Sequence, residues 1–234
     1  MFQFSLSFSN AHRCPSADIA VNFTDGMFKG IYHGKQYHVP DIQTVLSRAW
    51  RAGVDRIIEG YFVLSGCIRL DVKFLAGVTH SFTGSAEDRD KLLSFNNMYI
   101  GVNGCSLKTA QNLDVVRGIP VERMMIETDS PYCEIKKTHA GVKMVKLKRP
   151  SQKKEKYDPE CLVKGRNEPC LVRQVLEVVA ECKCISDIHQ LSQSLYHNTC
   201  RVFFPHDIDS AADAILAGNE AQEEICSRPV CSGT

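Results

Sequence analysis

The segment Met-Met-Ile-Glu-Thr-Asp-Ser-Pro-Tyr at residues 124–132 decides the fold class. Its apolar start leads directly into Glu127, Thr128 and Asp129, and Pro131 ends the extended run. An apolar run without alternation predicts a buried strand of a parallel sheet rather than a surface strand. Carboxylates at the carboxyl end of such a strand lie where α/β folds place their chemistry. The alternative is that Glu127 and Asp129 only cap the turn that follows.

Outward from this segment, predicted strands and helices alternate along the chain. The segments that predict strands are 18–24, 54–58, 76–82, 98–102 and 123–128. Helical periodicity begins after Asp41, and Gly53 is placed as a C-terminal stop. Ser85 with Asp88 predicts a capping box, and Thr109 starts another helix. This alternation predicts an α/β fold with parallel strands.

The last third of the chain is predicted to be largely helical. Asn167 is expected to be the N-cap of a helix with Pro169 in its first turn, where the missing N–H does no harm. A second helix is expected from near Ser186 to Phe204, and a short Ala-rich helix at 207–217.

The composition is that of an ordinary globular protein. The chain has 234 residues, of which 44% are hydrophobic and 24% charged, and a formal net charge of +1. No segment approaches the ~18–20 consecutive apolar residues of a membrane span. The eleven cysteines include no Cys-x-x-Cys pair and no zinc-ligand spacing. We therefore expect reduced thiols in an intracellular protein.

Positive charge is concentrated in residues 136–156. This segment contains nine Lys or Arg residues and one acid, Glu155. Such a concentration suits a polyanionic partner, of which nucleic acid is the commonest. The alternative is a solvated loop whose charges prevent aggregation.

Six short segments, at predicted strand ends and in the helical part, carry a more specific pattern. They are Asp18-Ile-Ala-Val-Asn-Phe-Thr24, Gly77-Val-Thr-His-Ser-Phe-Thr-Gly84, Tyr99-Ile-Gly-Val-Asn-Gly104, Ile126-Glu-Thr-Asp-Ser-Pro-Tyr132, Arg166-Asn-Glu-Pro169 and Asn198-Thr-Cys-Arg-Val-Phe-Phe204. Together, over about 18–58 and 76–204, they resemble the TatD family of metal-dependent deoxyribonucleases, and most closely its eukaryotic members.

This resemblance implies a TIM-type (β/α) barrel whose mouth binds one or two divalent metal ions. About five of the eight barrel strands have a counterpart here, so we expect an incomplete barrel. The family segments that supply a metal-binding Glu and a His have no counterpart, and a first-strand His-x-His pair is replaced by Ala20 and Asn22. Residues 59–75, which have no clean period, stand where strands three to five would be. Three β/α units would amount to ~90 missing residues.

The resemblance assigns two site residues directly. His80 matches a metal-ligating histidine, and Asp129 matches both a metal ligand and the acceptor of the proton of the nucleophilic water. Imidazole and carboxylate suit Mg²⁺, Mn²⁺ or Zn²⁺. The alternative for His80 is a strand-end histidine that bonds to a backbone carbonyl. Glu127 and Asn22 are expected to be supporting groups.

Further contacts are expected from the basic segment, which follows the last predicted strand. Lys136, Lys137, His139 and Lys143 are expected to contact DNA phosphates without sequence preference, and the alternative for His139 is a side chain that only faces solvent. Separately, an ion pair between Arg166 and Glu168 is expected to order the loop before the predicted helix that begins at Pro169.

The expected function is metal-dependent hydrolysis of DNA phosphodiester bonds. Because two ligand-bearing segments have no counterpart, a catalytically impaired chain that only binds nucleic acid stays open as the alternative. The expected organisation is a variable or disordered lead at 1–17, a hydrolase domain at 18–216 with an internal deletion near 59–75, and a flexible tail at 217–234. The cytoplasm or nucleus is the expected location, without membrane attachment, and organelle targeting by the lead is not expected.

Overall fold

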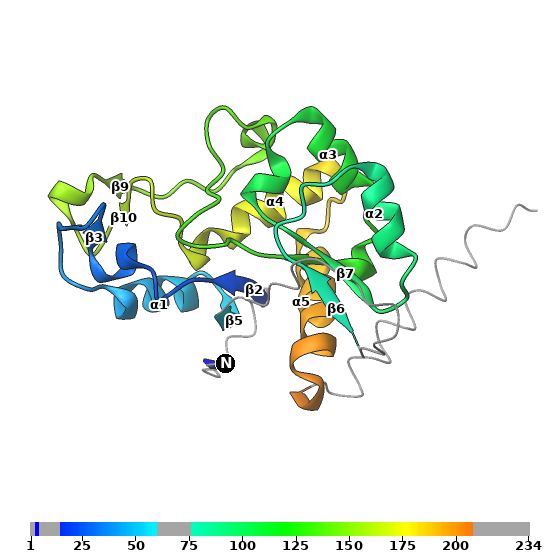
Figure 1. Ribbon diagram of the computed structural model, residues 1–234, viewed down its shortest axis with the longest axis horizontal. Coiled ribbons are helices and arrows are strands. Elements are labelled where there is room, and N and C mark those ends of the chain that lie inside the picture. The colour runs from blue at the N-terminus through cyan, green and yellow to red at the C-terminus, as the bar shows by residue number, and fades with distance from the viewer. Residues whose placement is uncertain (1–2, 5–14, 60–75, 208–234) are drawn as a thin grey trace, which may run out of the picture.

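Strands and helices alternate through the first half of the chain, and helices dominate its end (Figure 1). The computed structural model describes residues 3–4, 15–59 and 76–207. The longer strands are β2 (Ser16–Val21), β5 (Val54–Glu59), β6 (Gly77–Thr79), β7 (Met98–Val102) and β8 (Met124–Ile126). The α-helices are α1 (Ile42–Arg51), α2 (Ala86–Leu93), α3 (Ala110–Arg117), α4 (Val172–Cys182) and α5 (Ile188–Phe203). The short strands are β1 (Gln3–Phe4), β3 (Ile31–Tyr32), β4 (Lys35–Gln36), β9 (Ser151–Gln152) and β10 (Leu162–Val163). The 3-10 turns are η1 (Gly26–Lys29), η2 (Gly104–Leu107), η3 (Val121–Arg123), η4 (Ala140–Met144), η5 (Lys154–Lys156), η6 (Pro169–Leu171) and η7 (Pro205–Asp207).

The longer strands form two parallel sheets that meet where β2 lies beside β8. β2 pairs in parallel with β5, and β7 pairs in parallel with both β6 and β8. A parallel bridge joins Val21 to Ser130, and the amide of Asn22 donates to the carbonyl of Ser130 at 2.7 Å. The strand order across this junction is therefore β5-β2-β8-β7-β6, with β1 antiparallel on the outer edge of β5. The prediction of an α/β fold with parallel strands is confirmed.

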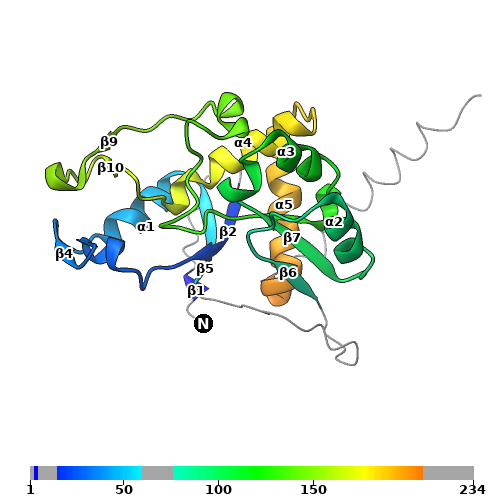
Figure 2. The ribbon, with the colours of Figure 1, turned by 45° about the horizontal axis from the view of Figure 1, so that its top comes forward.

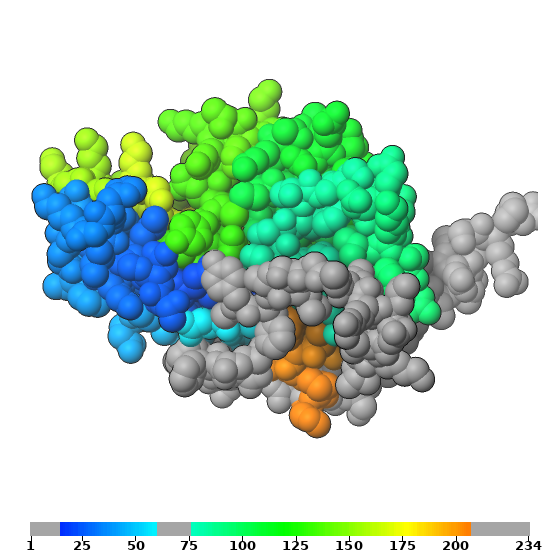
Figure 3. Space-filling view, viewed as in Figure 1, coloured from blue at the N-terminus to red at the C-terminus, as the bar shows by residue number. Residues whose placement is uncertain are grey.

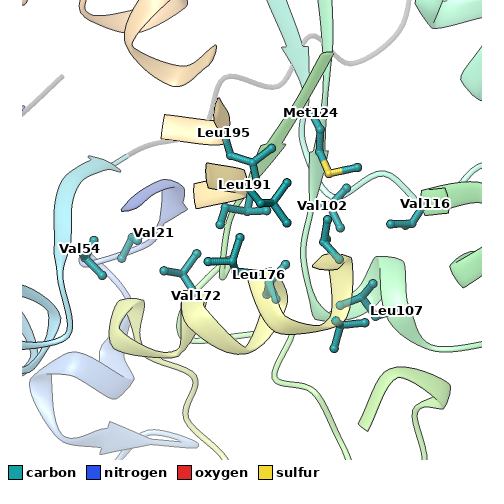
Figure 4. Packing of buried hydrophobic residues seen from close by; sticks show 14 of the residues in the cluster. Val21, Val54, Val102, Leu107, Val116, Met124, Val172, Leu176, Leu191 and Leu195 are labelled. Carbon is teal, nitrogen blue, oxygen red and sulfur yellow. The ribbon is translucent and has the colours of Figure 1, made fainter. Parts of the chain in front are cut away.

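Helices α4 and α5 pack across this junction. Both contact β2 and β8, and both lie near the centre of the molecule in two views (Figures 1 and 2). Val172 of α4 and Leu195 of α5 lie between Val21 of β2 and Met124 of β8 (Figure 4). Full burial of an aliphatic side chain is worth about 1.5–3 kcal/mol. Apolar packing under these two helices therefore holds both sheets on one core.

The predicted helix signals at α1, α2 and α3 are confirmed. Ser85 with Asp88 forms a complete capping box at the start of α2, and Thr109 with Asn112 forms another at the start of α3. Gly53 follows the C-cap of α1 with φ of 89°, a left-handed conformation that glycine adopts without steric cost. Local hydrogen-bonding chemistry therefore sets these ends.

The strand ends differ from the prediction in a way that matters for function. β6 ends at Thr79 and β8 ends at Ile126, earlier than the predicted ends at 82 and 128. His80, Glu127 and Asp129 consequently lie in the loops just beyond the strands, at the same edge of the sheet.

The start of α4 also differs from the prediction. Asn167 does not cap the helix, because its Nδ2 donates to the carbonyls of Thr128 at 2.9 Å and Tyr132 at 2.8 Å. The chain instead enters through η6, whose N-cap residue Glu168 makes no side-chain cap hydrogen bond. Pro169 does occupy the first turn, but of η6. The side-chain amide of Asn167 therefore makes tertiary hydrogen bonds to the loop after β8 instead of capping the helix.

Some predictions fall on residues outside the described ranges. These are most of the irregular segment 59–75, the short helix at 207–217 beyond Asp207, and the tail at 217–234. Inside the predicted lead, Gln3–Phe4 pairs with β5, and β2 already begins at Ser16. Among the described helices, none combines the length and apolar character needed to cross a membrane.

A buried ion network joins α1 to the segment before α4. Arg166 donates to both oxygens of Asp41, at 2.8 and 2.7 Å, and to Oε1 of Glu168 at 2.8 Å. Arg48 donates to both oxygens of Glu168, at 2.8 and 2.9 Å. None of these side chains is more than 5% exposed. The expected pairing of Arg166 with Glu168 is confirmed, and the two guanidinium groups are compensated by two carboxylates.

Asp18 lies at the junction of the two sheets. Its carboxyl is fully buried and accepts from the amide of Thr128 at 2.9 Å and from the hydroxyl of Thr128 at 2.5 Å. Burial raises the pKa of Asp18 to about 7, even though hydrogen bonds from Thr128 act in the opposite direction. The folded chain therefore holds a proton here well above the ordinary range of an aspartate.

Replacing Glu168 by Gln is expected to lower the free energy of unfolding by about 3 kcal/mol, because two buried guanidinium groups lose one of their carboxylates. Urea unfolding measures the loss. Asp114→Asn is the matched control, since it removes the 68%-exposed partner of Arg117 and should cost less than about 1 kcal/mol. Equal losses in the two variants would contradict the role given to the buried network.

The free energy of unfolding should also contain a pH-dependent contribution from Asp18. The pKa of this carboxyl is 3.8 in the unfolded chain and about 7 in the folded chain. Its contribution to the free energy of unfolding is therefore fully present below pH 3.8 and is lost as the pH rises through 7. Asp18→Asn should remove this decline, of up to about 4 kcal/mol, and keep the hydrogen bond from the Thr128 amide. Urea unfolding from pH 4 to pH 8 compares the two chains. If the free energy of unfolding changes with pH in the same way in both chains, Asp18 is not the source of the pH dependence.

Candidate active site

Polar side chains from four strand ends converge at the carboxyl edge of the sheets. His80 follows β6, Asn103 follows β7, Asp129 follows β8, and Asn22 follows β2. Because these strands are parallel, their carboxyl ends share one edge, which is where α/β folds place their sites. The family resemblance assigned His80 and Asp129 as metal ligands. The fold brings these two residues together, although 49 positions separate them in the chain.

Glu127 is the buried centre of this arrangement. Its carboxylate has no exposed surface and accepts from Nδ1 of His80 at 2.9 Å, the amide of Ser81 at 2.7 Å and Nδ2 of Asn103 at 3.0 Å. Gly101 of β7 makes room for it, since a Cβ there would lie 3.0 Å from Oε2 of Glu127 and 2.7 Å from a backbone oxygen of β6. One carboxylate therefore fixes the ends of three strands.

His80 bridges two carboxylates. Its Nε2 lies 3.3 Å from Oδ1 of Asp129, while its Nδ1 is bonded to Glu127. Hydrogen bonding to Asp129, and then to Glu127, raises the pKa of His80 to about 10. Both ring nitrogens face carboxylates rather than the backbone carbonyl of the alternative interpretation. The ring is 36% exposed, so it is also within reach of solvent.

Asp129 is held in an unusual backbone conformation. Its φ is 55°, in the left-handed region that Asp tolerates better than most residues. Asn22 Nδ2 donates to Oδ1 at 3.2 Å, and Cys133 Sγ donates to Oδ2 at 3.2 Å. Burial alone raises the pKa of Asp129, but hydrogen bonds from His80 and Cys133 outweigh it and leave the pKa lowered. The carboxylate is therefore ionised, oriented and 16% exposed.

Sequence reasoning did not single out Ser81, Asn103 or Cys133. Asn103 could have been predicted, because it directly follows the predicted strand 98–102 and therefore lies at the carboxyl end of a strand. Ser81 and Cys133 could not, since they contact the site through positive-φ turns, with φ of 51° and 54°. Such turns are decided by packing around the loop.

The residues expected to contact DNA phosphates separate into two groups. Lys136, Lys137 and Lys143 are exposed. Figure 3 shows the green part of the chain, around residues 100–145, over the upper part of the molecular surface. His139 is only 8% exposed, and its Nδ1 has no hydrogen-bond partner within the described residues. Burial, and then the charges of Lys108 and Lys136, lowers the pKa of His139. The interpretation of His139 as a solvent-facing side chain is therefore wrong.

His80 and Asp129 carry the imidazole and carboxylate groups that divalent cations accept, and an ion at His80 would have to displace the proton that its raised pKa keeps on Nε2. The proton on Nδ1 of His80 is held by the buried carboxylate of Glu127, which directs Nε2 towards Asp129. Metal-bound histidines commonly have this carboxylate partner on the other nitrogen. Within residues 15–59 and 76–207, no three His, Cys, Asp or Glu side chains are arranged to hold an ion.

Comparison with known proteins gives partial but clear matches. The family model described as "TatD related DNase" matches residues 66–204, more than half of the chain. "Deoxyribonuclease Tat-D" of Schizosaccharomyces pombe is 48% identical over 125 residues, and that of Saccharomyces cerevisiae is 45% identical over 143. These matches cover 53% and 54% of this chain but 39% and 34% of the relatives. An uncharacterized metal-dependent hydrolase of Escherichia coli is 33% identical over 129 residues, which is 54% of this chain and 39% of the relative.

Solved structures of related proteins have a similar fold. A hydrolase TatD family protein from Entamoeba histolytica matches with a TM-score of 0.71 and 24% identity, over 82% of this chain and 99% of the other. An uncharacterized amidohydrolase from Saccharomyces cerevisiae matches with a TM-score of 0.70 and 25% identity, over 81% of this chain and 100% of the other. The family match covers His80, Asn103 and Asp129 but not Asn22. The chain belongs to the TatD-related DNase family.

Proposed function

We propose that this chain is a metal-dependent deoxyribonuclease that hydrolyses phosphodiester bonds of DNA, with His80 and Asp129 at its reaction centre. The observation that carries the proposal is the 3.3 Å approach of His80 Nε2 to Asp129 Oδ1 at the carboxyl edge of the sheets. The names of the relatives, "Deoxyribonuclease Tat-D" and a metal-dependent hydrolase, support the substrate and the reaction class. Because the chain matches well under half of those relatives' length, its own activity is part of the proposal.

We further propose that the fold is a (β/α) barrel with three units missing. In the order β5-β2-β8-β7-β6, the first long strand of the chain lies beside the last. A closed eight-stranded barrel requires the same neighbours, with these strands as its second, first, eighth, seventh and sixth. The hydrolase domain is proposed to span 18–216, extended at its start by the first two residues of β2, Ser16 and Ala17, with the tail at 217–234 outside it, and the gap falls near 59–75.

Divalent cation binding follows from the donor set. Mg²⁺ or Mn²⁺ is commonly held by one or two protein groups, with waters and substrate phosphate oxygens completing the coordination, and Zn²⁺ also accepts imidazole and carboxylate ligands. When bound, the ion supplies a water of lowered pKa and polarises a phosphate oxygen. Two protein ligands, His80 and Asp129, suit an ion that depends on substrate for part of its shell.

The side chains around these ligands position them and handle the proton. Asp129 accepts the proton of the water that attacks phosphorus, since its lowered pKa keeps it ionised before the reaction. Asn22 and Cys133 orient its two oxygens. Glu127 holds the ring of His80 in one orientation. This preorganisation places the reacting groups before DNA arrives.

The exposed lysines of the basic segment supply contacts to the DNA backbone. Lys136, Lys137 and Lys143 follow β8 in the same connection that carries Asp129, and each is exposed. They provide charge without reading bases. His139 is too deeply buried to contact a phosphate, so the proposed set does not include it. A cytoplasmic or nuclear location agrees with the free thiols of the described cysteines.

Asp129→Asn is expected to lower Mg²⁺- or Mn²⁺-dependent cleavage of single-stranded DNA by about 100-fold or more, because the proton acceptor and one ligand are lost. Cleavage is measured during a titration of each metal. Asp114→Asn, on the exposed face of α3, is the matched control and should cleave like the unsubstituted chain. Background cleavage by all three chains, with DNA binding retained, would reject the enzyme in favour of a protein that only binds nucleic acid.

Replacing Lys136, Lys137 and Lys143 together by Ala should weaken DNA binding and make it less sensitive to salt. Each lost phosphate contact is expected to reduce the slope of log affinity against log salt by about 0.7 for single strands. Fluorescence anisotropy over a salt series measures both quantities. The control replaces three other exposed lysines, Lys29, Lys91 and Lys164. If both triple variants have the same slope of log affinity against log salt, DNA does not bind at Lys136, Lys137 and Lys143.

A further inference from the structure

Two cysteines from separate loops meet directly behind Asp129. Cys105 lies in the first turn of η2, after β7, and Cys133 lies in the loop after β8. Their Sγ atoms are 2.9 Å apart, although 28 positions separate them in the chain. Cys105 donates to Cys133, and Cys133 donates in turn to Oδ2 of Asp129 at 3.2 Å. Both thiols are half-buried and free.

The two loops are fixed in this approach by contacts other than the sulfurs. A Cβ on Gly104 would lie 2.0 Å from the carbonyl oxygen of Cys133, so only glycine allows the two backbones to touch here. The amide of Cys105 donates to Oδ1 of Asn103 at 2.8 Å. The carbonyl of Tyr132 accepts from Asn167 at 2.8 Å. The thiols are therefore held together by the surrounding backbone, as a pair must be to join without backbone movement.

We propose that Cys105 and Cys133 are a modification site, a dithiol that peroxide converts to a disulfide at the mouth of the sheets. In the first step one thiol gives up its proton, its sulfur attacks an oxygen of hydrogen peroxide, and the O–O bond breaks. The leaving hydroxide takes up a proton, so that a sulfenic acid and one water result. In the second step the other thiol attacks that sulfenic sulfur, the S–O bond breaks, and the S–S bond forms with release of a second water. Two thiols are oxidised and one peroxide is reduced to two waters.

The disulfide changes what surrounds Asp129. It removes the S–H donor from Oδ2 of Asp129 and ties the loop after β8 covalently to η2. Any consequence for DNA cleavage rests on the proposed function. The cross-link itself does not, so it can be tested in a chain whether or not that chain cuts DNA.

The test treats the full, reduced chain with hydrogen peroxide in small increments and maps peptides without reduction. We expect the first cross-linked pair to contain Cys105 and Cys133, and dithiothreitol to reverse it. The melting temperature of the oxidised chain should rise by on the order of 5–10 °C, because the cross-link closes a loop in the unfolded chain. Cys105→Ser and Cys133→Ser should each abolish the cross-link and the shift.

Cys161→Ser is the matched control. Cys161 is also half-buried, and its Sγ lies 3.7 Å from Oδ2 of Asp158, so it shares the carboxylate neighbour but not the thiol partner. Its substitution should leave the cross-link intact. Cross-links scattered among the cysteines, or separate conversion of Cys105 and Cys133 to sulfinic acids without a bond between them, would overturn the proposal. A cross-link in a chain without nuclease activity would support this site and reject only the proposed function.

Discussion

The contact between β2 and β8 is the constraint on which the rest of the structure depends. One parallel bridge, Val21 to Ser130, and one hydrogen bond, from Asn22 to Ser130, turn two small sheets into a single succession of strands. Buried Asp18 joins the same two strands through Thr128. Helices α4 and α5 cover the junction with apolar side chains. Because of this contact, the carboxyl end of the first strand lies beside the last, and Asn22 reaches Asp129.

Buried Glu127 joins the strand ends into one hydrogen-bonded cluster. A carboxylate without solvent is costly unless it is fully hydrogen-bonded. Here three donors, from His80, Ser81 and Asn103, supply that compensation. The same hydrogen bonds determine how His80 faces Asp129. Stability and positioning therefore share one group, which explains why β7 carries glycine, Gly101, beside it.

Several features could be predicted because their causes are local. Capping boxes at Ser85 and Thr109 act within one helical turn, and Gly53 meets a backbone requirement at its own position. Asn167 shows the limit of such reasoning. Its side chain suits a helix cap, but two carbonyls of the loop after β8 offer stronger competition. Local preference is worth about 1 kcal/mol, and tertiary hydrogen bonds readily exceed it.

The sequence by itself determined the parallel α/β class, the family resemblance and the choice of His80 and Asp129 as candidate ligands, because apolar periodicity and short motifs are properties of neighbouring residues. Only the tertiary structure decided that Glu127 and Asn103 meet, that His139 is buried, and that Cys105 lies against Cys133. Those contacts join residues far apart in the chain. They depend on strand order, backbone approach at Gly104 and competition for hydrogen bonds, which are set when the loops pack together.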